Sequence, residues 1–302
     1  MSSWSGKTRG GIAGYKVFVF LIKHTGIAFA YFLLFFVVFY YLLTSIKSVK
    51  ASYCYFRSIQ KFNFFRSCLS VYKNFFIFGQ TLIDKIAVMS GVDNKLNFYF
   101  DGEEHLIKMV NEKTGGMLVS AHVGSFEIAG YLLKRINTKV HILMYEAEHQ
   151  NIKKYLSGVY KDITAHIITI KEDMSHIYEI KKVFENKEFL CLHGDRFVSG
   201  SKTIAMTFMG NQAAFPTGPF YLAQKYKVPV SYVFAVKKST FAYRFLATPA
   251  KYYYTEKINL RTKTAHQEQI IKDYIKALEN VIMNYPHQWF NFYYFWEKKY
   301  QR

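Results

Sequence analysis

The stretch Met117-Leu-Val-Ser-Ala-His122-Val-Gly-Ser-Phe-Glu127-Ile-Ala-Gly130 decides the fold of this chain. Its first four residues are apolar or small and follow a pair of glycines, which predicts the end of a buried strand. Gly124 and Ser125 then predict a turn and an N-cap, with a helix after them. His122 is therefore expected where a strand ends and a helix begins, the crevice in which open α/β sheets usually bind ligands.

Glu127 lies five positions after His122, in the first turn of the predicted helix. The helix dipole favours a carboxylate there, and the side chain could fold back to hold the imidazole. A histidine with an orienting carboxylate is the minimum machinery of a general base. The alternative to a catalytic pair is purely structural. Glu127 would then cap the helix, and His122 would have its hydrogen bonds satisfied at the strand end.

The composition indicates an anionic partner. The 302 residues are enough for one large α/β domain with an extension. Lys and Arg number 40 against 21 Asp and Glu, a formal net charge of +19, which favours phospholipid headgroups, an acidic carrier protein or nucleic acid as partner. A lysine-rich genome accounts for part of this excess. The 29 Phe and 25 Tyr suit a protein at a membrane interface.

The cysteines predict neither a disulfide framework nor a zinc site. Cys54, Cys68 and Cys191 are odd in number and lack C-x-x-C spacing, which favours reduced thiols in a cytoplasm-facing protein. The histidines show no metal-ligand spacing either, so we expect no metal and no cofactor.

The N-terminal region predicts membrane attachment. Thr25–Ile46 contains no charged residue over 22 positions, long enough for a helix to cross a hydrocarbon core. Basic residues flank both ends, so the positive-inside rule gives no orientation. A helix that spans the bilayer and one that lies in a single leaflet both fit. Ala51–Met89 continues as a basic, aromatic helical region, and nothing in it resembles a nucleic-acid-binding module.

The Gly91–Lys95 segment marks a predicted boundary between an N-terminal membrane-anchoring helical region, residues 1–92, and an α/β domain, residues 93–302. The alternating pattern in the second part predicts a sheet with helices on its faces. The expected strands are 118–120, 140–145, 166–170, 189–192, 230–236 and 243–248. The expected helices are 104–112, 126–135, 151–160, 175–186, 218–226 and 266–284.

A second predicted strand also ends in polar residues, His193-Gly194-Asp195-Arg196. If this strand runs parallel to the strand before His122, the two carboxyl ends lie close together. Arg196 suits phosphate binding because its planar fork donates two parallel hydrogen bonds. The alternative for Asp195 is a surface ion pair, and His193 is expected to be structural.

The Phe215-Pro-Thr-Gly218-Pro219 turn is a further candidate for the site. Pro216 stiffens it, Gly218 allows close backbone approach, and Pro219 suits the first turn of a helix. The N–H groups at that helix start could bind a phosphate or an oxyanion.

His122-x4-Glu127, preceded by "LVSAHVG", resembles the H-x4-[D/E] motif of the lysophospholipid acyltransferase superfamily, in the branch that contains the lipid A late acyltransferases. The "F-P-x-G" turn, the "V-P-V" at residues 228–230 and the "P-x-Q-W" of the tail at 285–296 are similar to later blocks of the same branch. That tail could also act as an aromatic strap that seals the core. The resemblance covers the whole chain and is strongest at 116–130, 189–220 and 285–296.

The resemblance implies a glycerolipid acyltransferase-like α/β fold, with a mixed, largely parallel sheet flanked by helices. It implies a membrane-bound enzyme that moves a fatty acyl chain from an acyl carrier protein or coenzyme A thioester to a hydroxyl or amine of a lipid. It makes His122 the general base and Glu127 its orienting partner. The implied substrate-binding residues are Asp195, Arg196, Thr217 and Gly218.

Thr217 stands where glycerophosphate-type enzymes usually carry glutamate, which disfavours glycerol-3-phosphate and lysophosphatidate as acceptors. A lipid A precursor, an amino-acid lipid and an aryl-polyene lipid stay open. The expected location is the bacterial inner membrane, with the catalytic domain facing the cytoplasm and no nucleic-acid partner. The rival is a non-catalytic membrane lipid-binding or assembly protein, against which the intact His122 and Glu127 argue. A hydrolase is disfavoured because no G-x-S-x-G elbow occurs.

Overall fold

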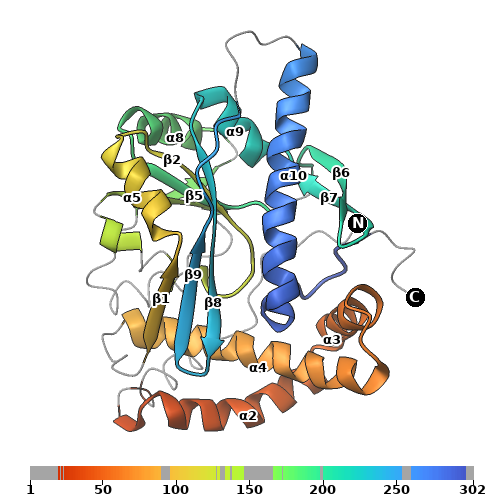
Figure 1. Ribbon diagram of the computed structural model, residues 1–302. Helices are drawn as coiled ribbons and strands as arrows, with labels where there is room; N and C mark the ends of the chain where they lie inside the picture. The colour runs from red at the N-terminus through yellow and green to blue at the C-terminus, as the bar shows by residue number, and fades with distance from the viewer. Residues whose placement is uncertain are drawn as a thin grey trace.

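A seven-stranded sheet forms the centre of the molecule, in the order β1-β9-β8-β2-β5-β3-β4 (Figure 1). The computed structural model describes residues 20, 22, 24–89, 96–126, 128–129, 133–136, 138–145, 166–171, 173–197, 200–253 and 260–296. The strands are β1 Asn97–Asp101, β2 Gly116–Ser120, β3 Val140–Tyr145, β4 His166–Ile170, β5 Phe189–His193, β8 Val230–Ser239 and β9 Ala242–Ala247.

The sheet is mixed and largely parallel, as predicted. β2 pairs in parallel with β5 and β8, and β3 pairs in parallel with β4 and β5. β9 is antiparallel to β8, and β1 is parallel to β9, so these two strands run against the rest. The six strands expected from the sequence are all present. β1 was not expected, because it is short and exposes alternate residues.

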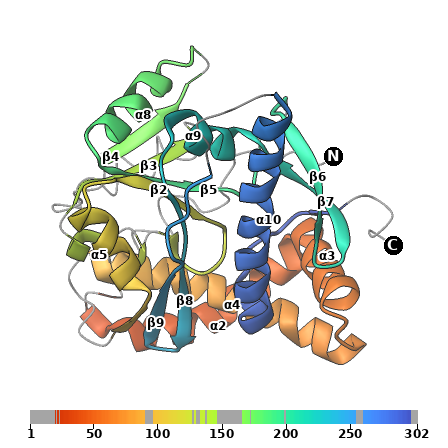
Figure 2. The same cartoon turned by 45° about the horizontal axis from the view of Figure 1, so that its top comes forward.

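Both faces of the central strands are buried, which explains why β2 and β5 are nearly continuous apolar runs. Met117 and Val119 pack into one core cluster with α9 and α10, whereas Leu118 packs into a second cluster with α5. α5 and α10 accordingly lie on opposite sides of the sheet (Figures 1 and 2). The helices are α5 Glu103–Asn111, α8 His176–Glu185, α9 Gly218–Tyr226 and α10 Leu260–Asn284.

These four helices agree with the predicted ones, although α10 begins earlier than expected. The predicted helix at 151–160 lies outside the described residues. The predicted helix at 126–135 is described only in part: residues 126, 128 and 129 are helical, and Leu133–Ile136 forms a 3-10 turn.

The N-terminal region is a stack of helices beneath the sheet (Figure 1). The uncharged run forms α2, Ile27–Thr44, which packs along α4, Phe64–Met89. Between them lie α3, Ile46–Cys54, and a π-helical turn, Tyr55–Ile59. By length and composition, α2 is the one described helix that could cross a membrane. The domain boundary at residue 92 falls outside the described residues and stays a prediction.

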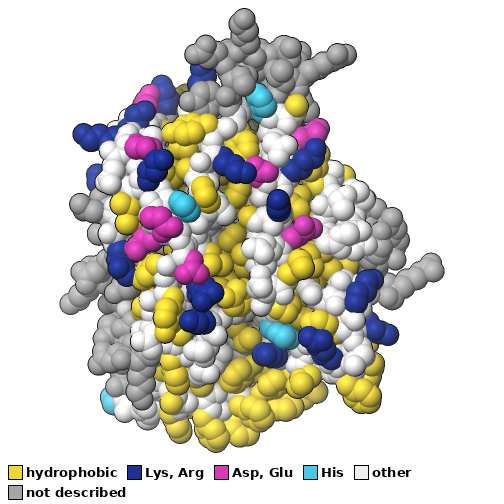
Figure 3. All heavy atoms as spheres, in the orientation of Figure 1, with side chains coloured by type: hydrophobic (Ala, Val, Ile, Leu, Met, Phe, Trp, Pro, Cys, Tyr) yellow, Lys and Arg dark blue, Asp and Glu magenta, His cyan; other side chains and the backbone are white. Residues whose placement is uncertain are grey.

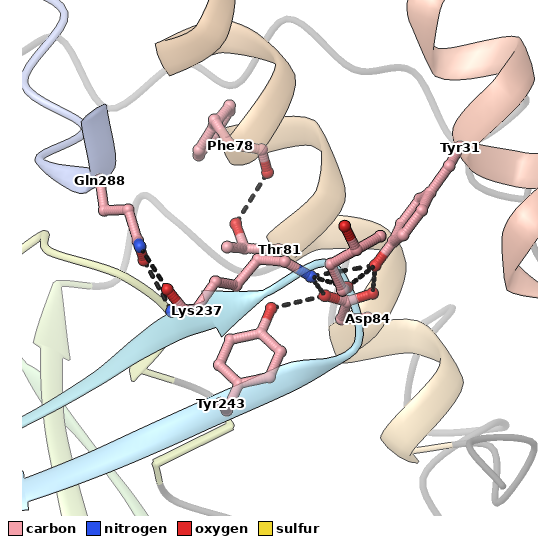
Figure 4. A network of polar contacts seen from close by, with 8 residues as sticks. Tyr31, Phe78, Thr81, Asp84, Lys237, Tyr243 and Gln288 are labelled. Atoms are coloured by element: carbon pink, nitrogen blue, oxygen red, sulfur yellow. Dashed lines mark hydrogen bonds and ion pairs between the residues drawn. The ribbon is translucent and has the colours of Figure 1, made fainter. Parts of the chain in front are cut away.

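A buried polar network joins these helices to the β8–β9 hairpin (Figure 4). Asp84 of α4 forms an ion pair with Lys237 of β8 and accepts hydrogen bonds from Tyr31 of α2 and Tyr243 of β9. The side chains of Asp84 and Lys237 are 0% and 4% exposed. Burial lowers the pKa of Lys237, and the charge of Asp84 opposes that effect. A charge pair so deeply buried requires hydrogen-bond partners, and here the network draws on four elements, α2, α4, β8 and β9.

Two further segments pack near α10. β6, Thr203–Phe208, and β7, Asn211–Pro216, form an antiparallel hairpin that was not among the expected strands. After α10, a 3-10 turn, Pro286–Gln288, leads into an aromatic strap, residues 289–296. Trp289 bridges to Val123 beside β2, and Trp296 bridges to Ala213 of β7.

Candidate active site

His122 and Asp195 meet at the carboxyl ends of two neighbouring parallel strands. Ser120 of β2 is in register with His193 of β5, and each strand is followed two residues later by one member of the pair. Nδ1 of His122 lies 2.8 Å from Oδ1 of Asp195. The backbone N–H of His122 donates to Oδ2 of the same carboxylate at 3.0 Å. The expected proximity of the two strand ends is therefore confirmed.

Asp195 contacts His122 and is fully buried. Its residue surface is 0% exposed, and the indole N–H of Trp289 lies 3.5 Å from Oδ2. Burial raises the pKa of this carboxyl. His122 opposes that effect through its charge and its hydrogen bond, and Arg196 opposes it through its charge. Together they outweigh burial and keep the pKa well below its usual range. The oxygens of Asp195 face His122 and Trp289, and the substrate-binding role expected for Asp195 stays a prediction. The proposed alternative of a surface ion pair is excluded by the same burial.

Glu127, the orienting partner expected from the motif, lies outside the described residues. Its role stays a prediction. The pairing of Asp195 with His122 was not expected from the sequence, because the two residues are 73 positions apart. Only the parallel pairing of β2 with β5 brings them together.

The turn after His122 needs glycine at position 124. Gly124 has φ +68°, and a Cβ built on it would lie 2.0 Å from the carbonyl oxygen of Ala235. The backbone passes this close because Ser125 N–H donates to that same carbonyl at 2.8 Å. The tight turn anchors the loop that carries His122 to the neighbouring strand β8.

The C-terminal strap fixes the backbone of the same loop. Phe290 N–H donates to the carbonyl of His122 at 2.8 Å, and Gly124 N–H donates to the carbonyl of Gln288 at 2.9 Å. The side chain of Gln288 binds both the N–H and the C=O of Lys237 at 2.7 Å. Asn74 of α4 donates to the carbonyl of Trp289 at 3.2 Å. The predicted "P-x-Q-W" tail thus reaches the site through its main chain, and it also contributes to the sealed aromatic core.

His193 approaches the opposite end of the His122 ring. Its Nδ1 lies 3.3 Å from Nε2 of His122, and the two ring centroids are 4.2 Å apart. Phe126 packs edge-on against the His193 ring, with the ring centroids also 4.2 Å apart. His193 was expected to be structural, but its Nδ1 lies against Nε2 of His122, the nitrogen that a general base would use.

Arg196 lies beside the site and is tied to the strap. One terminal nitrogen donates to the carbonyl of Phe290 at 2.7 Å, and the guanidinium carbon lies 5.7 Å from the ring centroid of Tyr293. Its side chain is partly exposed. It contributes positive charge next to Asp195 and retains donors beyond the one that Phe290 accepts.

Thr217 and Gly218 begin α9, as the sequence predicted. Thr217 bonds the carbonyl of Lys202 through both its backbone N–H, at 3.0 Å, and its hydroxyl, at 3.2 Å. Gln267 of α10 donates to the carbonyl of Thr217 at 2.9 Å. These contacts fasten α9 to β6 and α10, so they give Thr217 a structural task. The substrate-binding role of the two residues stays a prediction.

His122, His193 and Asp195 each offer one ligand atom within 4.8 Å of the others, so a metal ion could be held here. Such an ion would have to displace the proton shared by Nδ1 of His122 and Oδ1 of Asp195. The close pairing of those two atoms fits a hydrogen-bonded acid–base pair without any ion.

The whole arrangement, from α4 to the strap, coincides with one family model. The model of bacterial lipid A biosynthesis acyltransferases matches residues 71–298. The chain belongs to this family. The resemblance inferred from the His122 motif is therefore confirmed, and this lipid A biosynthesis acyltransferase homologue is an enzyme that acylates lipid substrates.

Among solved structures, the chain is similar to the 1-acyl-sn-glycerophosphate (LPA) acyltransferase PlsC from Thermotoga maritima. The identity is 12%, the match covers 84% of this chain and 98% of that one, and the TM-score is 0.39. No curated protein matches the chain significantly.

Proposed function

We propose that this enzyme transfers a fatty acyl chain from a thioester to a hydroxyl or amine of a membrane lipid, with His122 as the general base. The contact between Nδ1 of His122 and the buried carboxylate of Asp195 supports this most directly. An ionised carboxylate only accepts hydrogen bonds, so it keeps the proton on Nδ1 and leaves a lone pair on Nε2. That is the tautomer a base requires.

In this reaction Nε2 of His122 takes the proton of the acceptor as its oxygen or nitrogen attacks the thioester carbonyl. The carbon–sulfur bond of the tetrahedral intermediate then breaks, and the proton passes from Nε2 to the departing thiolate. Asp195 stabilises the imidazolium that exists between these steps. Glu127 retains its predicted orienting role through the motif. No covalent acyl-enzyme is needed.

The donor is an acyl carrier protein or coenzyme A thioester, and both carry phosphate on a pantetheine arm. The net charge of +19 and the partly exposed Arg196 support an anionic donor. The acceptor is a lipid of the kind that this family acylates. Thr217 in place of glutamate supports an acceptor other than lysophosphatidate.

We further propose that α2 lies along the cytoplasmic face of the bacterial inner membrane. One side of α2 is buried against α4 through Ile27, Ala30, Tyr31, Leu34 and Val38. The other side exposes large apolar residues, among them Phe32, Phe36, Phe39, Tyr40 and Leu43. Figure 3 shows apolar side chains gathered at the bottom of that view, where α2 lies in Figure 1. One side of α2 is covered by α4, which carries charged residues. Such a helix fits better in the membrane–water interface, parallel to the membrane plane, than across the bilayer.

The test is acyl transfer by the purified enzyme in vesicles of bacterial lipid extract. Labelled acyl-coenzyme A and acyl carrier protein thioesters are supplied in parallel, and the products are identified by mass spectrometry. We expect a labelled lipid and free thiol, and a donor KM that rises with salt. His122→Ala should lower kcat by at least about 10²-fold, whereas His105→Ala on the surface of α5 should not. Wild-type activity of His122→Ala would refute the proposal.

A further inference from the structure

The second histidine of the site, His193, is held in a defined orientation. It is the last residue of β5, in register with Ser120, so the sheet positions its backbone. Its ring contacts the rings of both His122 and Phe126, each at 4.2 Å between centroids. One ring nitrogen, Nδ1, faces Nε2 of His122 at 3.3 Å. These two ring contacts and the strand position support an orientation in which Nδ1 points at His122.

The position of the proton between the two histidines follows from Asp195. The carboxylate keeps the proton of neutral His122 on Nδ1, so Nε2 carries a lone pair and can only accept. A favourable contact at 3.3 Å then requires a proton on Nδ1 of His193. His193 is therefore a hydrogen-bond donor aimed at the lone pair of the base. The separation is at the long end for a hydrogen bond from nitrogen, so it is readily exchanged for another acceptor.

We propose that His193 is a catalytic residue whose Nδ1–H binds the oxyanion formed during acyl transfer. This rests on His122 being the base. When the acceptor hydroxyl occupies Nε2, it displaces the donor of His193 from that lone pair. The oxyanion sits on the same carbon that the acceptor oxygen attacks, so it forms next to Nε2 and within reach of the displaced donor. His193 donates a hydrogen bond only: the acceptor's proton travels through Nε2 of His122 to the leaving sulfur.

A donor role can be separated from simple packing by the choice of side chain. Asparagine places its amide nitrogen the same number of bonds from Cα as Nδ1 of histidine, so His193→Asn keeps an N–H at that place. His193→Leu fills similar space beside Phe126 but has no donor. His193→Gln keeps the amide but moves its nitrogen one bond further out.

The experiment measures kcat and donor KM of the three variants in the vesicle assay, with Tm as the folding control. We expect His193→Leu to lower kcat by about 10²–10³-fold with donor KM little changed. His193→Asn should recover at least about ten-fold of that loss. His193→Gln should resemble the leucine variant, and it replaces that variant in the comparison if leucine prevents folding.

Two results would overturn the donor role: wild-type kcat in the variant without a donor at Nδ1, or His193→Asn being as slow as that variant. Equal losses in both variants would indicate either packing or a proton relay that asparagine cannot perform. His122→Ala is measured in the same series. If it is inactive while His193→Leu or His193→Gln is fully active, only the role of His193 fails. If His122→Ala is itself active, the proposed function fails.

Discussion

At the residue scale, Nδ1 of His122 can donate its proton to only one of two carboxylates, Asp195 or the predicted partner Glu127. Nδ1 of His122 carries a single proton, and Asp195 accepts it at 2.8 Å. Glu127, expected from the H-x4-E spacing to hold the same ring, therefore needs a different contact if both act in one step. A carboxylate near the start of a helix could instead act through the backbone or the substrate. Comparison of Asp195→Asn with Glu127→Gln decides which one orients the imidazole.

The sequence located His122 correctly because the strand–turn–helix pattern around it is local. It could not reveal the partnership with Asp195, since that contact depends on which strands are neighbours in the sheet. It assigned His193 a structural role for the same reason, because nothing nearby in the sequence shows what the ring faces. Burial rules out the surface ion pair considered for Asp195, because its surface is 0% exposed.

At the scale of elements, periodic patterns predicted the long helices and the apolar strands. β1 was missed because it is a short strand with alternate residues exposed. The β6–β7 hairpin was missed because its residues packed in the core are interspersed with exposed polar ones. Its turn at Met209-Gly210 has positive φ at both residues, a hairpin signal that the sequence analysis overlooked.

The buried ion pair between α4 and β8 gives a stability prediction. Asp84→Asn leaves the ammonium of Lys237, which is 4% exposed, without its counter-charge. Removal of one partner from such a pair costs about 3–5 kcal/mol of unfolding free energy. We therefore expect a clear fall in Tm, measured by differential scanning fluorimetry in detergent.

The matched control removes both charges. The double variant Asp84→Leu, Lys237→Met should recover most of the lost stability, because no uncompensated charge is left in the core. A double variant as unstable as Asp84→Asn would show that the hydrogen bonds from Tyr31 and Tyr243 to Asp84, and not the ion pair, stabilise this junction.

At the scale of the whole molecule, the exposed apolar side of α2 is connected through α4 and the strap to the strand ends that carry His122 and Asp195. α4 packs against α2 and also donates, through Asn74, to the strap that binds the His122 loop. The side chains of α4 and the main chain of the strap therefore link α2 to the loop that carries His122. The sequence predicted the attachment, but the packing of α2 along α4, which supports an in-plane position, is visible only in three dimensions.

The membrane contact is tested by charge on the exposed side of α2. Phe36 and Leu43 are 56% and 77% exposed, so Phe36→Glu with Leu43→Glu removes no core contact. We expect this variant to move from the carbonate-washed membrane pellet to the supernatant, because carboxylates disfavour insertion into the interface. Tyr178→Glu on α8, at a residue 75% exposed, is the control and should stay in the pellet. Retention of both proteins would assign anchoring to another surface.

The central claim is that His122 and Asp195 work as one unit, and a double-mutant cycle on kcat tests it most directly. Asp195→Asn should lower kcat by about 10²–10⁴-fold, because the amide no longer fixes the tautomer or stabilises the imidazolium. His122→Ala should cost at least as much, and the double variant should be scarcely slower than His122→Ala alone, since no base is left to orient. Losses that multiply in the double variant would contradict the account, because they would show that the two residues act independently.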